Sequence, residues 1–105
     1  MNNRAPSQFR DDVYNLMAQV PYGHVATYGD LAALAGHPYA ARVVGQIAHF
    51  GPEGLPWHRL VNKTGVMARG YWGGPEAHRV MLEAEGVEVK EFKIVSIERF
   101  HWRPL

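Results

Sequence analysis

Residues 27–49 read TYGDLAALAGHPYAARVVGQIAH, and this stretch decides the fold. Thr27 is a favourable N-cap, and the aspartate three residues later completes a near capping box, so a helix is expected to begin here. Gly36 is placed to end that helix. Pro38 then suits the first turn of a second helix, which is expected to run to about His49. Two short helices joined by a tight connection predict a helix-turn-helix over about residues 28–49.

Each helix of this pair has one apolar side. The side chains expected to face the core are Leu31, Leu34 and Ala35 in the first helix and Ala40, Val43, Val44 and Ile47 in the second. The other side of the second helix carries Ala41, Arg42 and Gly45. A glycine in mid-helix costs about 1 kcal/mol relative to alanine, so something should compensate for it. Either the small residues let another surface approach this side, with Arg42 projecting between them, or Gly45 admits a neighbouring helix.

The remaining sequence completes one small domain over residues 1–105, long enough for its own core. The fold class expected is mainly α with minor β structure. The landmarks along the chain are a helix capped by Ser7, turns at 21–23 and 62–65, a helix that starts at Pro75 and ends at Gly86, a short strand at 87–90 and a tail at about 91–105. The tail has alternating apolar residues and no evident chemistry.

The composition is that of an ordinary globular protein, with 47% hydrophobic and 20% charged residues. No apolar run approaches the roughly 18 residues of a membrane helix, so an intracellular, cytoplasmic location without membrane contact is expected. The absence of cysteine excludes disulfides, a thiolate metal site and thiol catalysis. The six histidines form no His-x-x-x-His pair, and neither a metal nor a cofactor is expected.

The net charge of +1 is unevenly distributed along the chain. Residues 39–72 contain four basic residues and one acidic residue, a net charge of +3, whereas the segments on either side each carry −1. The five charged residues of this segment are Arg42, Glu53, Arg59, Lys63 and Arg69. Positive charge gathered in one segment favours contact with nucleic-acid phosphates.

The same segment contains the tetrapeptide Pro56-Trp57-His58-Arg59, which is followed by a glycine-rich loop with two aromatic residues. Six stretches of the chain resemble, in the same order, motifs of the C-terminal domain of the O6-alkylguanine-DNA alkyltransferases. They are PYG at 21–23, TYGDLA at 27–32, ARVVG at 41–45, PWHR at 56–59, YWGG at 71–74 and EAEG at 83–86. Six fragments in order, over roughly residues 7–88, make a specific signal.

In that family the tetrapeptide holds a cysteine whose thiolate removes the alkyl group from guanine O6 by direct displacement. Trp57 stands at its position, and an indole has no comparable nucleophile because its nitrogen lone pair belongs to the aromatic system. With this substitution and no N-terminal domain ahead of the match, the chain most resembles the alkyltransferase-like proteins. The resemblance implies a winged helix-turn-helix-like domain that binds double-stranded DNA containing O6-alkylguanine without enzymatic repair. It also implies transfer of the lesion to nucleotide excision repair proteins (UvrA in bacteria), and a monomer is expected.

The resemblance also implies roles on the DNA. The second helix of the pair is expected to lie in the minor groove, where Ala41 and Gly45 would allow close approach. Arg42 corresponds to the arginine that enters the base stack and fills the space of the flipped nucleotide. Tyr28 corresponds to the tyrosine that helps to turn the target phosphate outward. Flipping costs a few kcal/mol, and less where O6-alkylation has already weakened the base pair.

Four residues are expected to line the lesion pocket. Trp57 would form an apolar wall beside the base, and Tyr71 and Trp72 would complete the lining. Arg69 lies where the subfamily places an arginine over the flipped base, a cation–π contact of about 0.5–2 kcal/mol.

Four further residues are expected to support the site without catalysing a reaction. His58 and Glu85 match the pair that relays a proton away from the cysteine in the transferases, but here there is no thiol to activate. Pro56 and Arg59 complete the tetrapeptide. A histidine held by a carboxylate can fix the local backbone through hydrogen bonds.

The chain departs from the transferases beside the pocket. They place a hinge asparagine near the end of the recognition helix, where Gly51 is the nearest residue here. The loop from Gly51 to Leu55 is also about two residues shorter. The range of alkyl groups accepted therefore does not follow from the transferases.

Two other functions are open at the level of sequence. A residual enzyme would use a histidine or methionine as alkyl acceptor, or His58 with Glu85 to activate water. Alkylguanine presents a poor electrophile for water, and no metal cluster is available to help. A helix-turn-helix transcriptional regulator would read bases in the major groove, but one arginine between alanine and glycine offers few groups for base edges.

Overall fold

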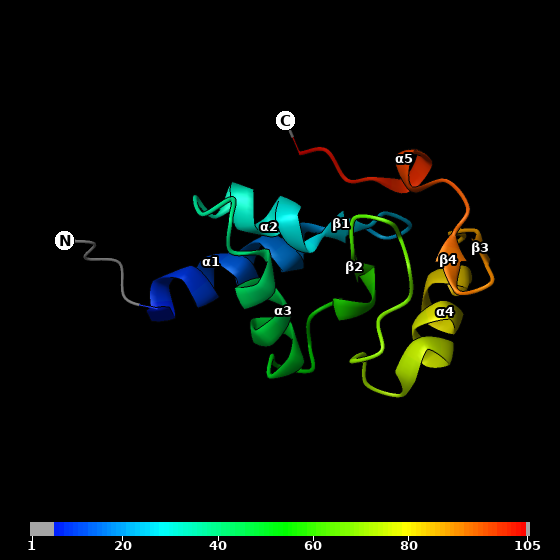
Figure 1. Cartoon of the computed structure of the whole chain (residues 1–105), viewed down its shortest axis with the longest axis horizontal. Helices are drawn as coiled ribbons and strands as arrows, with labels where there is room; N and C mark the ends of the chain where they lie inside the picture. The colour runs from blue at the N-terminus through cyan, green and yellow to red at the C-terminus, as the bar shows by residue number, and fades with distance from the viewer. Residues whose placement is uncertain (1–5, 105) are drawn as a thin grey trace.

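The computed structural model of the protein describes residues 6–104 and is mainly helical, with two two-stranded sheets (Figure 1). The elements are α1 (Pro6–Gln19), β1 (Ala26–Thr27), α2 (Tyr28–Leu34), α3 (Ala41–His49), the 3₁₀ turn η1 (Trp57–Arg59), β2 (Leu60–Val61), α4 (Gly74–Ala84), β3 (Val89–Lys90), β4 (Lys93–Ile94) and α5 (Ile97–Phe100). None of the helices within residues 6–104 has the length and apolar character needed to cross a membrane.

The predicted helix-turn-helix is present as α2 and α3. The capping box at its start is confirmed, since Asp30 N donates to Thr27 Oγ1 at 3.0 Å and Thr27 N donates to Asp30 Oδ2 at 2.9 Å. Gly36 follows the end of α2 with a φ of +91°, the left-handed conformation that glycine adopts at helix ends. These local signals were sufficient to place α2.

The predicted start of α3 at Pro38 is wrong, because the helix begins three residues later at Ala41. The intervening residues form a turn in which Ala40 N donates to His37 O at 2.9 Å. Pro38 lies in this turn, a position that also suits its fixed φ angle. The predicted end of the helix at His49 is confirmed.

Three side chains do not lie where the periodicity places them. Ser7 is inside α1 and does not cap it, because the helix already includes Pro6. Leu34 and Val43 were expected in the core but are 38% and 43% exposed. Leu31 and Ala35 of α2 and Val44 of α3 are buried as expected.

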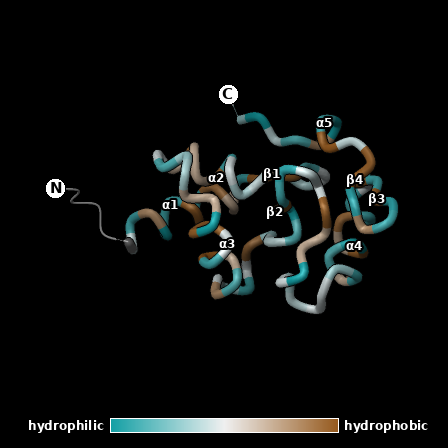
Figure 2. Tube along the Cα trace, in the orientation of Figure 1, coloured by the Kyte–Doolittle hydropathy of each residue, from teal (hydrophilic) through white to brown (hydrophobic). Residues whose placement is uncertain are grey.

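The two strands β1 and β2 lie between two hydrophobic cores. They pair in parallel, with Ala26 opposite Leu60. Successive strand residues point to opposite faces, so Ala26 and Leu60 pack with α1, α2 and α3, whereas Val25 and Val61 pack with α4 and the β3–β4 segment. In Figure 2 the hydrophobic stretches gather where α1, α2 and β1 lie together.

The C-terminal segment is packed against this frame, although no role is predicted for it from the sequence. It returns past β1 and α2 (Figure 1), where Val25 N donates to Phe100 O and Trp102 N donates to Val25 O, both at 2.8 Å. The His101 ring is hydrogen-bonded to the Asp30 carboxylate, which completes the capping box of α2. Trp102 packs against the first core. The tail therefore braces the start of the helix-turn-helix.

Candidate functional site

A cavity of about 420 Å³ opens where the helix-turn-helix meets the segments around the tetrapeptide. Its volume falls in the range of small-molecule and cofactor sites. The walls come from α2 and α3, the loop after α3, η1 with β2 and the loop before α4. The lining residues are Tyr28, Gly45, Ala48, His49, Gly51, Pro52, Glu53, Leu55, Trp57, Leu60, Ala68, Gly70, Tyr71 and Trp72.

Trp57 forms part of this wall as the first residue of η1. Its indole is half-buried, and Nε1 donates to the carbonyl of Pro52 at 2.8 Å. The Tyr14 ring meets the indole edge to face, with centroids 6.1 Å apart and planes at 75°. The indole is thus held in one position and presents an apolar surface, without a nucleophile, to the cavity.

Two predicted aromatic residues close the cavity from the loop before α4. Tyr71 stacks on His78 with ring centroids 4.7 Å apart, and burial raises the pKa of its hydroxyl. Trp72 also lines the cavity but is 91% exposed, at the rim. One ring is therefore anchored and the other is free for a ligand to cover.

Tyr28 lies between this cavity and a second hollow of about 370 Å³. Burial raises the pKa of the Tyr28 phenol, which keeps it a neutral hydroxyl donor at neutral pH. Arg69 lines the second hollow together with Asn62 and does not line the cavity that contains Trp57. The two hollows share Tyr28, Ala68 and Gly70, so Arg69 lies next to the cavity.

Of the predicted DNA-facing residues of α3, Gly45 lines the cavity, and Ala41 and Arg42 do not. Ala41 and Arg42 are at the start of the helix, and Arg42 is exposed, without an ion pair among the described residues. Gly45 lines the cavity beside Tyr28, where an added Cβ would lie 3.9 Å from Tyr28 Cε1, an ordinary contact distance. Packing within residues 6–104 therefore does not require glycine at this position.

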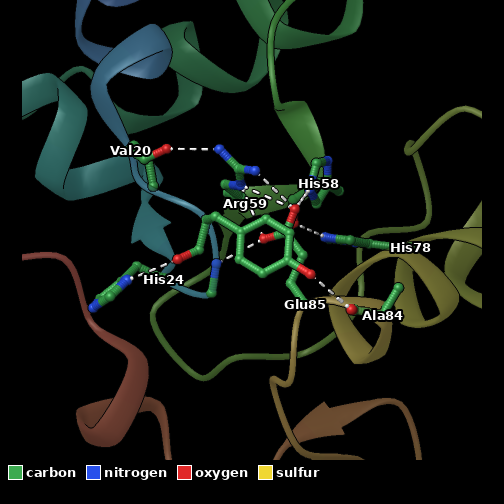
Figure 3. Close-up of polar contacts among 9 residues, drawn as sticks. Val20, His24, His58, Arg59, His78, Ala84 and Glu85 are labelled. Carbon is green, nitrogen blue, oxygen red and sulfur yellow. Dashed lines mark hydrogen bonds and ion pairs between the residues drawn. The ribbon is translucent and has the colours of Figure 1, made fainter.

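Behind the cavity, the Glu85 carboxylate joins three separate parts of the chain (Figure 3). It accepts hydrogen bonds from Gly23 N at 2.9 Å and from Arg59 Nη2 at 2.8 Å, and His58 Nε2 lies 2.6 Å from its Oε2. Arg59 Nη1 also donates to Val20 O at 2.9 Å. The network ties the end of α4 and η1 to the connection between α1 and β1.

The charge of Glu85 is stabilised despite its burial. Burial by itself raises the pKa of this carboxyl, but the hydrogen bonds from Arg59, the Gly23 amide and His58 together lower the pKa from 4.5 to about 2. Arg59 is thus committed to an internal ion pair, which removes it from the surface charge that the sequence assigned to residues 39–72. Pro56 directly precedes η1 and does not line the cavity.

His78 is an important residue that sequence reasoning missed. It is fully buried, its Nδ1 accepts from Ala68 N at 3.0 Å and its Nε2 donates to His58 O at 2.8 Å. These partners assign the neutral tautomer, and burial, the largest effect, lowers the pKa of His78. His78 therefore connects the tetrapeptide to the loop that carries Arg69 and Tyr71. The only sequence signal for its burial is its spacing, since it lies one helical turn before the buried Leu82 on α4.

Comparisons with known proteins agree on the kind of domain. Residues 8–87 match the family described as 6-O-methylguanine DNA methyltransferase, DNA binding domain. A DNA base-flipping protein of Escherichia coli is 43% identical over 98 residues, covering 90% of this chain and 74% of the relative. Alkyltransferase-like protein 1 of Schizosaccharomyces pombe is 36% identical over 104 residues, covering 92% of this chain and 96% of the relative.

Solved structures give the same result. The crystal structure of S. pombe Atl1 in complex with damaged DNA containing O6-carboxymethylguanine has a TM-score of 0.86 and 34% identity, covering 96% of this chain and all of the other. A Mycobacterium tuberculosis O6-methylguanine methyltransferase has a TM-score of 0.66 at 32% identity. This chain covers 53% of that transferase, so the likeness is to part of it.

Proposed function

Because the chain belongs to the alkyltransferase-like members of the O6-alkylguanine-DNA alkyltransferase family, we propose that it recognises O6-alkylguanine in double-stranded DNA without repairing it. One observation carries the proposal: Trp57 forms part of the wall of a cavity beside a helix-turn-helix. The resemblance of Pro56-Trp57-His58-Arg59 to the family motif implies that Trp57 stands where the transferases have their alkyl-acceptor cysteine. The chain contains no cysteine to replace it. The protein therefore binds the damaged base and leaves the alkyl group in place.

On the DNA, α3 enters the minor groove with Ala41 and Gly45 toward the sugar-phosphate walls. Arg42 enters the base stack where the damaged nucleotide leaves it, and Tyr28 turns the phosphate of that nucleotide outward. The exposure of Arg42 and the lack of an internal packing need for glycine at position 45 support this orientation. The flipped base reaches the cavity beside Tyr28 and Gly45, both of which line it.

In the cavity the base lies against the Trp57 indole and the Tyr71 ring, and Trp72 covers it from the rim. Arg69 moves from the adjacent hollow to stack over the base, a contact of about 0.5–2 kcal/mol. His58, Arg59 and Glu85 hold the wall in place from behind, and Pro56 sets the start of η1.

The bound lesion is then passed to nucleotide excision repair proteins, UvrA in bacteria. This step is part of the proposal because binding without chemistry protects no genome unless another system removes the damage. The protein acts as a monomer, since one copy supplies both the helix for the groove and the cavity for the base.

The proposal is tested by titrating labelled duplexes that contain guanine or O6-methylguanine at one position. Wild type is expected to bind the modified duplex more tightly than the plain one. Trp57→Ala and Arg42→Ala are each expected to lose about tenfold in affinity for the modified duplex, the first through lost stacking and the second through impaired flipping. Arg79→Ala is the control, because Arg79 is paired with Glu76 and Glu83 on α4. Equal affinity of wild type for both duplexes would overturn the proposal.

A further inference from the structure

Gly51 lies directly beneath the indole of Trp57. A Cβ added at Gly51 would lie 2.4 Å from Trp57 Cζ2 and 2.8 Å from Trp57 Cε2, closer than side-chain atoms approach one another. It would also lie 3.2 Å from the backbone oxygen of Ile47, which has little freedom to move at the end of α3. Gly51 does not have a positive φ angle, so the position requires glycine for space and not for conformation.

The indole cannot yield to such a Cβ without losing other contacts. Its Nε1 hydrogen bond to Pro52 O and its edge contact with Tyr14 both depend on the present ring position. Crowding a well-packed side chain in this way forces a shift that costs free energy. The ring can only move away from the end of α3.

The open space beside the ring is the cavity. Gly51, Pro52 and Trp57 all line it, so the indole borders the space that the flipped base would use. A ring displaced by a side chain at position 51 would therefore enter the cavity and reduce its volume of about 420 Å³.

We infer that Gly51 sets the size of the O6 substituent that the cavity accepts, by letting the Trp57 indole lie back against the end of α3. This inference rests on the proposed function, since it concerns the ligand of the same cavity. Small substituents such as methyl fit beside a displaced ring, whereas bulky substituents such as benzyl need the space that Gly51 provides. Gly51 is thus a specificity-determining residue that acts through the position of Trp57.

The test compares wild type with Gly51→Ala on duplexes that contain guanine, O6-methylguanine or O6-benzylguanine. Gly51→Ala is expected to weaken binding of the benzyl duplex about tenfold or more, and of the methyl duplex about threefold or less. Gly54→Ala is the matched control, because it adds the same methyl group to the same loop, at a position where a Cβ meets nothing within 4 Å. The control is expected to bind all three duplexes as wild type does.

A double variant removes the clash with the added Cβ at position 51 by making the ring at position 57 smaller. Phenylalanine has a single ring and lacks the fused six-membered ring of the indole, to which both clashing atoms belong. Gly51→Ala with Trp57→Phe is therefore expected to restore the wild-type ratio of benzyl to methyl affinity. The ratio is the correct measure, because a general loss of stacking cancels in it. The ring position is followed directly by nuclear magnetic resonance, in which the three tryptophans give three indole N–H signals. The Trp57 signal is expected to move in Gly51→Ala and to stay in Gly54→Ala.

An unchanged ratio in Gly51→Ala would overturn the inference while leaving the proposed function intact, provided that wild type still prefers the modified duplexes. An equal change of ratio in Gly54→Ala would also overturn it. If wild type does not distinguish any of the three duplexes, the proposed function itself fails, and the inference fails with it.

Discussion

At the scale of single residues, Glu85 illustrates how far a sequence position can differ from its structural role. By composition it is one of several acidic residues near the end of a helix, and without the family resemblance it is expected at the surface. In the structure its side chain is only 8% exposed and is bonded to Gly23, His58 and Arg59. Two of these partners precede it by 26 and 27 residues and the third by 62, so no local pattern reveals them.

Replacing this carboxylate should therefore destabilise the protein in a pH-dependent way. Glu85→Gln leaves Arg59 buried without its charge partner, and we expect a loss of about 3 kcal/mol in the free energy of unfolding at pH 7. The measurement is urea denaturation, followed by circular dichroism, at a series of pH values.

The sign of the pH effect follows from the lowered pKa of Glu85. Its folded pKa is about 2 and its ordinary value 4.5, so its contribution is complete above about pH 4.5 and is lost as the pH falls toward 2. The difference between wild type and Glu85→Gln should shrink across that window. Glu83→Gln is the control, because Glu83 is more exposed and pairs only with Arg79 on the same helix. A difference that stays constant from pH 7 to pH 2 would contradict this account.

At the scale of elements, local signals predicted α2 correctly and placed only one end of α3. The capping box at Thr27 and the glycine at position 36 act over three or four residues, so they can be read from the sequence. Pro38 suits both a helix start and a turn, and the hydrogen bond from Ala40 to His37 decides for the turn. The apolar periodicity placed Val43 inside, but the structure leaves its side chain exposed.

The C-terminal tail could not be predicted for a different reason. Its contacts join residues that are far apart in the chain, as in the pairing of His101 with Asp30 and of Trp102 with Val25. Alternating apolar residues indicate that such a segment packs somewhere, but they do not identify its neighbour. The result matters for the site, because the tail holds Asp30, which completes the capping box at the start of α2.

For one substitution on the surface of α3, we expect the stability of the protein to rise and its affinity for DNA to fall. Gly45→Ala places a methyl group at an ordinary distance from Tyr28, so the fold tolerates it and the helix gains up to about 1 kcal/mol. If α3 lies in the minor groove, the same methyl group should weaken binding to an O6-methylguanine duplex about tenfold.

Thermal unfolding measures the first effect and a titration of labelled duplex the second. A variant that is at least as stable as wild type and binds less tightly supports close approach of DNA to this side of α3. Unchanged binding would contradict the proposed orientation of the helix, since the added methyl group would then not meet the DNA.

At the scale of the whole molecule, the candidate site lies at the junction of the two hydrophobic cores. The parallel pair β1–β2 separates them, and the cavity draws its walls from both sides of that pair. Of the four residues expected to line the lesion pocket, Trp57, Tyr71 and Trp72 line the cavity, whereas Arg69 lines the adjacent hollow. Tyr28 was expected only to turn the target phosphate, and it also lines the cavity. The motifs did not give the space beneath the indole at Gly51, because that fact depends on the packing of two segments and not on either alone.

The distribution of charge over the molecule predicts a weak dependence of DNA binding on salt. Arg59 is neutralised internally by Glu85, so the cations of residues 39–72 without an ion pair are Arg42, Lys63 and Arg69. Each phosphate neutralised contributes about −0.9 to the slope of log affinity against log salt concentration, so two to three contacts give a slope of about −2 to −3. The slope is measured by titrating a plain duplex at several salt concentrations.

Such a shallow slope means that phosphate contacts supply little of the binding, and the preference for a lesion must then come from the cavity. Removing one of these cations with Lys63→Ala should reduce the slope by about one. Arg99→Ala should leave it unchanged, because Arg99 is already paired with Glu88. A slope steeper than about −5 would contradict this division, since it requires more phosphate contacts than the unpaired cations of residues 39–72 supply. Plain and alkylated duplexes should give parallel lines, because a neutral alkyl group changes the affinity and not the number of phosphates contacted.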